Sequence, residues 1–400
     1  MASKRPRVSC AASAKAGKES SPVVSRSVPW ETRLRLAVAA GGRCEFRGCN
    51  RFLYEHPLTK QEGTYAEAAH IVAFSEEGPR GDDAKRPVEI NSTENLMLLC
   101  QPCHKQIDDR PDDFPRALLE TFKREHEDRI HHVTGLAPDK RTVVVQMKAL
   151  IGGQAVEIPL SDVTLAVAPR YPMDRKGHLL DLTPLRDGGD TFYRAAAAKI
   201  RRDVHRLYEA GTDVDSVRHI SLFALAPIPL LVELGARLSN KIPVQLFQRH
   251  RDTMDWVWKA ETAQTQFAIR PVRTGTDPNK VVVVLPLSGP IALERLPASI
   301  DGEFSVYELG LEGRQPGTDF LRTREDLTRF EAKYRELLAR IVGAHPTANE
   351  IHLFPAVPAP VAVACGHQLL PKAQPSLLVY DQVNPKDGFI FCLRIEHDPA

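Results

Sequence analysis

One stretch of this chain occurs twice, and the repeat limits the folds that the second half can adopt. "ISLFALAPIPLLVELGARLSNK" at 220–241 aligns without a gap with "IHLFPAVPAPVAVACGHQLLPK" at 351–372. Each copy predicts a strand, a turn and a helix that begins near its prolines, because proline suits the first helical turn. The shared positions are Phe223/Phe354, Pro227/Pro358, Pro229/Pro360, Gly235/Gly366, Leu238/Leu369 and Lys241/Lys372.

Strand-like and helical runs alternate around both copies. "KVVVVLPL" and "FIFCLRI" are typical of strands, and "TREDLTRFEAKYRELLARI" is typical of a helix. "TVVVQMKALIGGQAVEIPL" predicts two strands joined by Gly152 and Gly153. Because such alternation indicates helices packed on sheets, we predict that residues 142–400 form an α/β domain of two fused, Rossmann-like halves.

The rest of the chain is long enough for a second domain. Four hundred residues exceed what one hydrophobic core usually holds. We predict a domain over 28–136 and a linker over 137–141. Residues 1–27 carry six Lys/Arg and one Glu with few large apolar side chains, so they are expected to be a disordered basic tail. A weak phosphate-attracting arm is the alternative.

The overall charge and the apolar runs exclude some classes of protein. A net charge of +2 favours no particular partner. No apolar run approaches the ~20 residues that a membrane span needs, and the N-terminus lacks the apolar segment of a secretory signal. We therefore expect a cytoplasmic protein with no membrane partner.

Four of the seven cysteines form two close pairs. Cys44 and Cys49 are spaced C-x4-C, and Cys100 and Cys103 are spaced C-x2-C. In a cytoplasmic chain such pairs indicate metal ligands rather than disulfides. Four thiolates complete a tetrahedral zinc site with no open position, so the zinc is expected to be structural.

Residues of catalytic type lie beside these cysteines. His70 ends a short apolar-leaning run, and Asn95 and His104 bracket the second cysteine pair. Taken alone, His70 is better explained by packing in a core than by catalysis. The zinc site would fix the turn that carries Asn95 and His104.

The cysteine pairs with His70, Asn95 and His104 resemble the ββα-metal fold of HNH endonucleases, an α+β domain that acts on double-stranded DNA. The resemblance implies that His70 is the general base that takes a proton from the attacking water. It also implies that His104 binds a catalytic divalent ion, usually Mg2+, and that Asn95 orients His70 or the metal shell.

The residue before His70 departs from that pattern. Many HNH enzymes carry an acidic metal ligand there, but this chain has Ala69. The nearest acid is Glu67, and odd offsets on an extended strand point to opposite faces. Glu67 is therefore expected to fit the metal site poorly unless the strand bulges, and the other metal ligands stay open.

The repeated half resembles a second family. "LFALAPIPLLVELGARLSNKIPVQLFQRHRDTMDWVW" and "IHLFPAVPAPVAVACGHQLLPK" are similar to the SAVED domain, two fused CARF-like units that bind cyclic oligonucleotides. With the HNH part, the chain resembles HNH–SAVED effectors of bacterial CBASS anti-phage signalling. That resemblance implies a DNA endonuclease activated by a cyclic di- or trinucleotide, working as a homo-oligomer that is dimeric or larger.

Ligands of open α/β sheets bind beyond the carboxyl ends of the strands. Here those ends are 224–229 and 355–360, together with "QRHR" and "LPLSGP". Core packing explains Trp256 and Trp258 as well as base stacking does. Surface salt bridges explain Arg249 and Arg251 as well as ligand contacts do. The candidate ligand-binding residues are Pro227, Pro229, Arg249, His250, Arg251, Trp258, Ser288, Gly289, Pro358 and Pro360.

Two other functions fit the same residues. A zinc-scaffolded DNA-binding regulator would use the cysteine site without cutting DNA. Alternatively, the nuclease is tethered to a repeat half that degrades its cyclic nucleotide. DNA sequence preference and the ring size and linkage of the nucleotide are not encoded in any pattern that we find.

Overall fold

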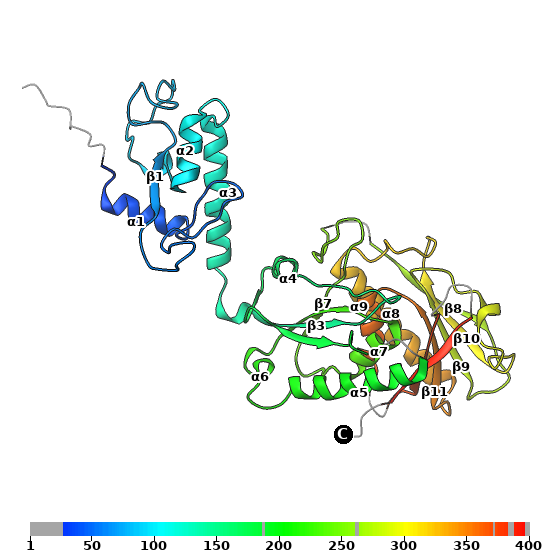
Figure 1. The fold of residues 1–400 in the computed structure, drawn as a ribbon. Helices are drawn as coiled ribbons and strands as arrows, with labels where there is room; N and C mark the ends of the chain where they lie inside the picture. The colour runs from blue at the N-terminus through cyan, green and yellow to red at the C-terminus, as the bar shows by residue number, and fades with distance from the viewer. Residues whose placement is uncertain (1–26, 186–188, 261–263, 371–372, 383–387, 397–400) are drawn as a thin grey trace, which may run out of the picture. The chain divides into compact units, whose positions relative to one another are not determined.

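The structure is a computed structural model that describes residues 27–185, 189–260, 264–370, 373–382 and 388–396 (Figure 1). Nearly all of the tail predicted over 1–27, and the repeat position Lys372, lie outside the described residues. The chain divides into two compact units, Met1–Gly135 and Leu136–Ala400, which we call unit 1 and unit 2. No helix of the described residues is long and apolar enough to span a membrane.

Unit 1 is built on a two-stranded antiparallel sheet. β1 (Ala66–His70) pairs with β2 (Leu96–Cys100), and His70 lies opposite Leu96. Every residue of β2 is buried, so this strand forms the centre of the core. The helices of unit 1 are α1 (Trp30–Ala39), η1 (Thr93–Asn95), α2 (Gln101–Asp109) and α3 (Arg116–Thr134). A strand pair followed by a helix is the order that the ββα resemblance implied.

Two sequence signals in unit 1 have direct structural causes. α1 is followed by Gly41 and Gly42, with φ of 60° and 68°, in the left-handed region where glycine carries no steric penalty. α2 begins directly after β2, so Cys100 ends the strand while Cys103 lies in the first helical turn. The strand–helix junction therefore positions the second cysteine pair.

Unit 2 contains two sheets. The first has the order β4-β3-β6-β7, with β5 also paired to β3, and all its pairs are parallel. Its strands are β3 (Arg141–Lys148), β4 (Tyr171–Pro172), β5 (His178–Asp181), β6 (Ile220–Leu225) and β7 (Val244–Leu246). Two strands were predicted, one on each side of Gly152 and Gly153, but only the first forms. Across the turn, a single bridge joins Ile151 to Gln154.

The second sheet has the order β13-β12-β11-β9-β10-β8, with four parallel central strands and an antiparallel strand at each edge. Its strands are β8 (Phe267–Arg273), β9 (Val281–Pro286), β10 (Ser305–Leu311), β11 (Glu350–Ala356), β12 (Ser376–Asp381) and β13 (Ile390–Ile395). Four consecutive valines make β9 buried along its whole length, as expected for a strand covered on both faces.

The helices of unit 2 complete the α/β layers. They are η2 (Pro138–Lys140), α4 (Leu160–Ala166), α5 (Gly189–Leu207), α6 (Asp213–Val217), α7 (Ile228–Arg237), η3 (Leu293–Arg295), α8 (Arg324–Ala344) and α9 (Ala359–His367). The repeat emerges as β6–α7–β7 and β11–α9–β12. This arrangement confirms the prediction of an α/β domain with two related halves.

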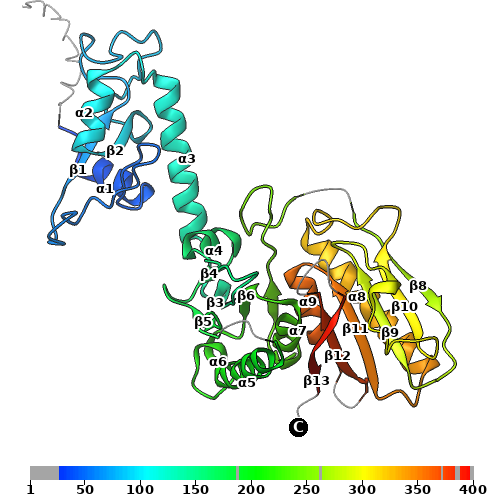
Figure 2. The same cartoon turned by 45° about the vertical axis from the view of Figure 1, so that its right-hand side comes forward.

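The repeated glycines lie where the two halves meet. α7 and α9 pack side by side between the sheets (Figure 2). A Cβ atom at Gly235 would lie 1.9 Å from the carbonyl oxygen of Val363, and one at Gly366 would lie 1.9 Å from that of Val232. The contact is reciprocal, so the same glycine is needed in each copy.

Candidate functional site

The four paired cysteines of unit 1 come together. Their Sγ atoms all lie within 4.8 Å of one another, and those of Cys49 and Cys100 are 3.9 Å apart. Ligand sulfurs around a tetrahedral zinc are about 3.8 Å apart, given Zn–S bonds of about 2.3 Å. Burial, with the neighbouring thiols, raises the pKa of Cys44 to about 12. A raised pKa means that the thiol loses its proton only at a cost in free energy. A bound cation offsets that cost, so the four-sulfur donor set fits a zinc ion.

His70 ends β1 with its imidazole half-buried. Its Nε2 lies 2.9 Å from the side-chain oxygen of Asn91, and that oxygen can only accept, so Nε2 carries the proton. The basic lone pair is then on Nδ1. Asn91 was not among the predicted site residues, since an asparagine in a polar loop carries no distinctive sequence signal.

Asn95 does not act on the His70 ring as the resemblance implied. It is 3% exposed, and its side-chain amide binds main-chain groups. Oδ1 accepts from the Val72 N–H at 2.9 Å, while Nδ2 donates to the carbonyls of Val72 and Ile90 at 3.0 and 2.9 Å. Asn95 therefore holds the segment that follows His70, and the contact to the imidazole comes from Asn91.

His104 lies on α2 between two carboxylates. Its Nε2 is 3.3 Å from Asp108 Oδ2, one helical turn later, and its Nδ1 hydrogen bonds to Glu67 on β1. Hydrogen bonding to Asp108, and less strongly to Glu67, raises the pKa of His104. As expected from its odd offset on β1, Glu67 lies on the strand face opposite to that of His70. On that face its carboxylate lies against His104.

Arg80 joins the two sides of this centre. Its side chain is 6% exposed, and it donates to the Ile71 carbonyl at 2.6 Å and to the Ile107 carbonyl at 2.8 Å. A third contact, 3.4 Å long, reaches Asp108 Oδ1. Arg80 thus connects the end of β1 to the end of α2. In the sequence, Arg80 is marked only as a cation in a Gly- and Pro-rich loop.

A cavity of about 240 Å3 lies at the carboxyl ends of the strands in unit 2. We call it the strand-end pocket. Arg249, Arg251, Ser288 and Pro358 line it, so four of the ten predicted ligand-binding residues are brought together. Both repeat copies contribute, through Ile228 and Ala359 at the first positions of α7 and α9.

The other six predicted residues do not line this pocket. Pro227 caps α7, and Pro229 and Pro360 are buried inside α7 and α9. Gly289 follows Ser288 without lining the pocket. The remaining two, His250 and Trp258, pack edge to face.

Residues 248–251 follow β7, and their side chains lie in two different environments. Arg249 and Arg251 line the pocket, whereas His250 is buried. Trp258 donates its indole N–H to the Leu246 carbonyl at 3.2 Å, and Trp256 is fully buried. Core packing therefore explains both tryptophans.

Gln248 also lines the strand-end pocket, although it was not a predicted site residue. Its Nε2 donates to the Arg249 carbonyl at 2.7 Å, whereas its Oε1 is buried and has no hydrogen-bond partner among the described residues. The pocket thus combines two guanidinium groups, two helix N-termini and an unsatisfied acceptor. These groups suit a ligand that carries both phosphates and N–H donors.

Two families match separate parts of this chain. Residues 44–110 match a family described as HNH endonuclease. Residues 198–395 match SAVED, described as the SMODS-associated and fused to various effectors sensor domain. The first match includes all four clustered cysteines together with His70, Asn95 and His104. No curated protein matches the chain.

Solved structures of Cap4 receptors are similar to this chain at low identity. A Cap4 SAVED/CARF-domain containing receptor of Acinetobacter baumannii with the cyclic trinucleotide 3'3'3'-cAAA is 13% identical, with 77% of this chain and 65% of that chain covered and a TM-score of 0.44. The receptor of Moraxella osloensis is 11% identical, with coverage of 73% and 60% and a TM-score of 0.40. This chain thus spans less than two thirds of the Cap4 chains.

Proposed function

Because this chain is an HNH–SAVED protein, an HNH endonuclease domain joined to a SAVED sensor domain, we propose that it is a CBASS effector that cuts double-stranded DNA when a cyclic oligonucleotide binds. The observation that carries the proposal is the presence of His70, His104 and the four-cysteine cluster in one small unit. In this proposal, the cyclic oligonucleotide binds in the strand-end pocket.

In the nuclease reaction, His70 is the general base. Nδ1 takes a proton from a water molecule as its oxygen bonds to the scissile phosphorus. The bond from phosphorus to the leaving deoxyribose oxygen then breaks. Asn91 accepts from Nε2–H at 2.9 Å, which fixes the tautomer with the lone pair on Nδ1 and stabilises the imidazolium formed by proton transfer.

His104 would hold the divalent ion through one ring nitrogen. Glu67 lies at Nδ1 and Asp108 at Nε2, so the carboxylate beside the coordinating nitrogen would be the second ligand and the other would hold the ring. An imidazole and a carboxylate suit Mg2+ or a similar ion. When bound, the ion supplies positive charge that stabilises the phosphate oxygens and the leaving oxygen. Before it binds, the carboxylates hold the His104 ring in place.

The four cysteines would hold a structural zinc. They fix the start of α2, and hence His104, relative to the turn after α1. Zinc here takes no part in the reaction, because four thiolates leave no open coordination position.

The strand-end pocket would bind the activator. Arg249 and Arg251 attract phosphates, and the N-termini of α7 and α9 add partial positive charge from each repeat copy. A cyclic di- or trinucleotide that contacts both copies binds one arrangement of the protein better than another, which is what a switch requires. We propose that the bound form assembles into a homo-oligomer.

A plasmid-cleavage assay tests this function. Full-length protein is incubated with supercoiled plasmid, Mg2+ and a panel of cyclic di- and trinucleotides. We expect one activator to be required, and EDTA to stop cleavage. His70→Ala should lower the rate by about 10²–10⁴-fold without changing activator binding, measured by calorimetry, or zinc content.

Four results would contradict the proposal. Wild-type rates in His70→Ala would remove it as the base. Full cleavage without any nucleotide would remove the switch. Tight, sequence-preferring DNA binding in EDTA with no nicking in Mg2+ would indicate a DNA-binding regulator, and linear products from the nucleotide would indicate a degrading domain.

A further inference from the structure

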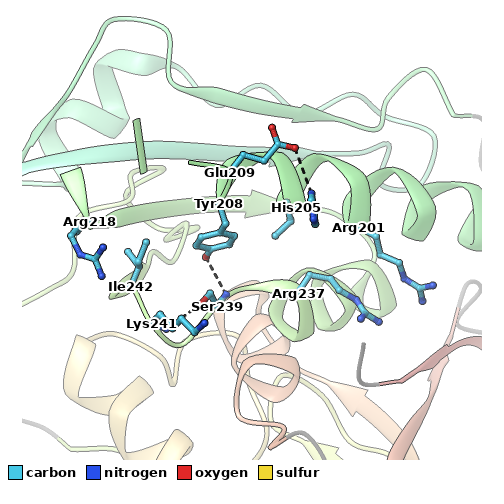
Figure 3. Close-up of a pocket in the computed structure, with 10 residues that line it drawn as sticks. Arg201, His205, Tyr208, Glu209, Arg218, Arg237, Ser239, Lys241 and Ile242 are labelled. Carbon is cyan, nitrogen blue, oxygen red and sulfur yellow. Dashed lines mark hydrogen bonds and ion pairs between the residues drawn. The ribbon is translucent and has the colours of Figure 1, made fainter. Parts of the chain in front are cut away.

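A second cavity lies at the opposite end of the first sheet of unit 2. Its volume is about 520 Å3. Arg218 lies just before β6, and Ile242 just before β7, so the cavity is at the start of these strands, whereas the strand-end pocket is at their carboxyl ends. We call it the strand-start cavity (Figure 3).

Four of the ten residues that line the cavity are arginine or lysine. Arg218 and Lys241 form no side-chain hydrogen bond or ion pair with any residue that the structure describes. Arg201 and Arg237 also line it, against a single acid, Glu209. Figure 3 shows Arg218 on one side of Tyr208 and Lys241, with Arg201 and Arg237 on the other. Positive charge thus brackets an aromatic ring.

A buried glutamate holds two of these arginines. Glu233 on α7 is fully buried. It accepts from Arg201 Nε at 2.7 Å and from Arg237 Nε at 2.9 Å. Because Glu233 occupies the Nε groups, parts of both guanidinium groups are held in fixed positions at the cavity wall. Arg201 keeps 46% of its side chain exposed.

The repeat shows that this arrangement is not needed for the fold. In the second copy the position of Glu233 is Ala364, and that of Arg237 is Gln368, although α9 packs in the same way as α7. Burying a carboxylate has a desolvation cost that its ion pairs do not always offset. The charged group is thus a feature of the first copy alone, and Arg237 also donates to the Glu396 carbonyl at 2.8 Å.

The centre of the cavity is apolar and aromatic. Val204 and Ile242 are buried, and Tyr208 accepts a hydrogen bond from the Ser239 N–H at 3.1 Å, which fixes the position of its ring. Small-molecule sites commonly combine apolar walls with a few fixed polar groups in a volume of roughly 300–1,000 Å3. An inorganic anion alone would leave this wall unused.

We propose that the strand-start cavity binds a nucleotide-like ligand, with its phosphates at Arg218 and Lys241 and its planar ring against Tyr208. This site is separate from the strand-end pocket and does not depend on the nuclease function. The ligand class follows from the free cations beside a fixed aromatic ring.

Calorimetry on the full-length protein tests the site with adenosine 5′-diphosphate as the probe. Adenosine, inorganic pyrophosphate and a short DNA duplex are the comparison ligands. We expect saturable binding of the diphosphate, weakened about tenfold or more by Lys241→Ala and by Arg218→Asn, since each removes a phosphate contact. Asparagine is used because Arg218 has a φ of 54°, which asparagine tolerates.

Matched variants identify the site. Arg202→Ala removes a neighbouring exposed cation of α5 that does not line the cavity, and Arg249→Ala alters the strand-end pocket; both should bind the diphosphate as the wild type does. Tyr208→Leu should weaken the diphosphate but not pyrophosphate. Thermal melting checks that each variant is folded.

Several outcomes would overturn the proposal. They are no binding of the diphosphate to wild type, equal weakening by Arg202→Ala, and loss in Arg249→Ala with retention in Lys241→Ala. Pyrophosphate binding as tightly as the diphosphate would leave only an anion site. Duplex binding that depends on Lys241 while the diphosphate fails to bind would assign the surface to nucleic acid.

Discussion

Single side chains in unit 1 hold together segments that are far apart in the sequence. Asn95 fastens the residues after His70, Asn91 orients the His70 ring, and Glu67 meets His104 across the strand and helix. Arg80 joins the same two elements through main-chain carbonyls and Asp108. The geometry of the nuclease centre therefore depends on residues that do not react.

We expect Arg80→Ala to slow DNA cleavage by about 10–100-fold, as loss of groups that orient metal ligands commonly does. The Mg2+ concentration for half-maximal cleavage should rise, because Asp108 loses a fixed partner. Arg80→Lys should recover little, since an ammonium group cannot reproduce the divided contacts of a guanidinium.

Arg86→Ala is the control for Arg80. Arg86 donates to the carbonyls of Gly81 and Phe74 in the same loop, and no described contact of it reaches Asp108. Its Mg2+ dependence should match that of the wild type. An Arg80→Ala protein with unchanged rate and Mg2+ dependence would show that Arg80 only stabilises the loop.

A buried histidine makes the stability of unit 2 depend on pH. Burial, with help from Arg170 and Arg324, lowers the pKa of His219 to about 4, and its Nδ1 is 2.8 Å from Thr142 Oγ1. Between about pH 6.5 and pH 4 the unfolded chain binds a proton that the folded chain does not. The stabilisation is therefore complete above pH 6.5 and falls as the pH drops toward 4.

The free energy of unfolding should fall by about 2 kcal/mol between pH 7 and pH 5 from His219 alone. Urea denaturation of wild type and His219→Asn at several pH values measures this. The variant should have the flatter profile, while His205→Asn, at an exposed position, should follow the wild type. Parallel profiles for wild type and His219→Asn would contradict the assignment.

At the scale of elements, the contact between α7 and α9 constrains the repeated sequence, because it requires a glycine in each helix. Each helix presents a glycine to a carbonyl oxygen of the other. Because both helices begin next to the strand-end pocket, their packing also sets the separation of the two helix N-termini. A single pair of glycines thus serves both the core and the proposed activator site.

We expect Gly235→Ala to lower the free energy of unfolding of unit 2 by about 3 kcal/mol or more, because the added methyl group must displace a backbone. Gly343→Ala is the control: it lies in α8 with open space around its Cα, so the helix should be stabilised by up to about 1 kcal/mol. Equal stability of the two variants by urea denaturation would contradict the packing argument.

At the scale of the whole molecule, the two units have separate hydrophobic cores. One core draws only on residues of unit 1, and the others only on residues of unit 2. Unit 1 has the smaller core, and small domains commonly need a metal or disulfides for stability. Loss of the proposed zinc should therefore affect unit 1 alone.

We expect one zinc per chain by elemental analysis, and Cys103→Ser should remove it. Hydrogen exchange in that variant should show unit 1 unfolded and unit 2 protected, because zinc binding and folding are coupled. Cys365→Ala, at a buried cysteine of α9, should keep the zinc. A folded unit 1 in zinc-free protein would rule out the four-cysteine site.

Local patterns in the sequence determined the parts of this protein that depend on neighbouring residues. The repeat predicted the paired α/β halves, the cysteine spacings predicted the four-sulfur cluster, and the Pro-x-Pro turns predicted where α7 and α9 begin.

Only the tertiary structure decided the contacts that close the sites. Glu67 and His104 are 37 positions apart, and Arg80 and Asp108 are 28 apart. Residue types and local periodicity carry no signal for such pairs, since their approach depends on how β1 and α2 pack. The burial of His250, the core packing of Trp258 and the contact of Asn91 with the His70 ring were decided in the same way. Each depends on neighbours supplied by other segments of the chain.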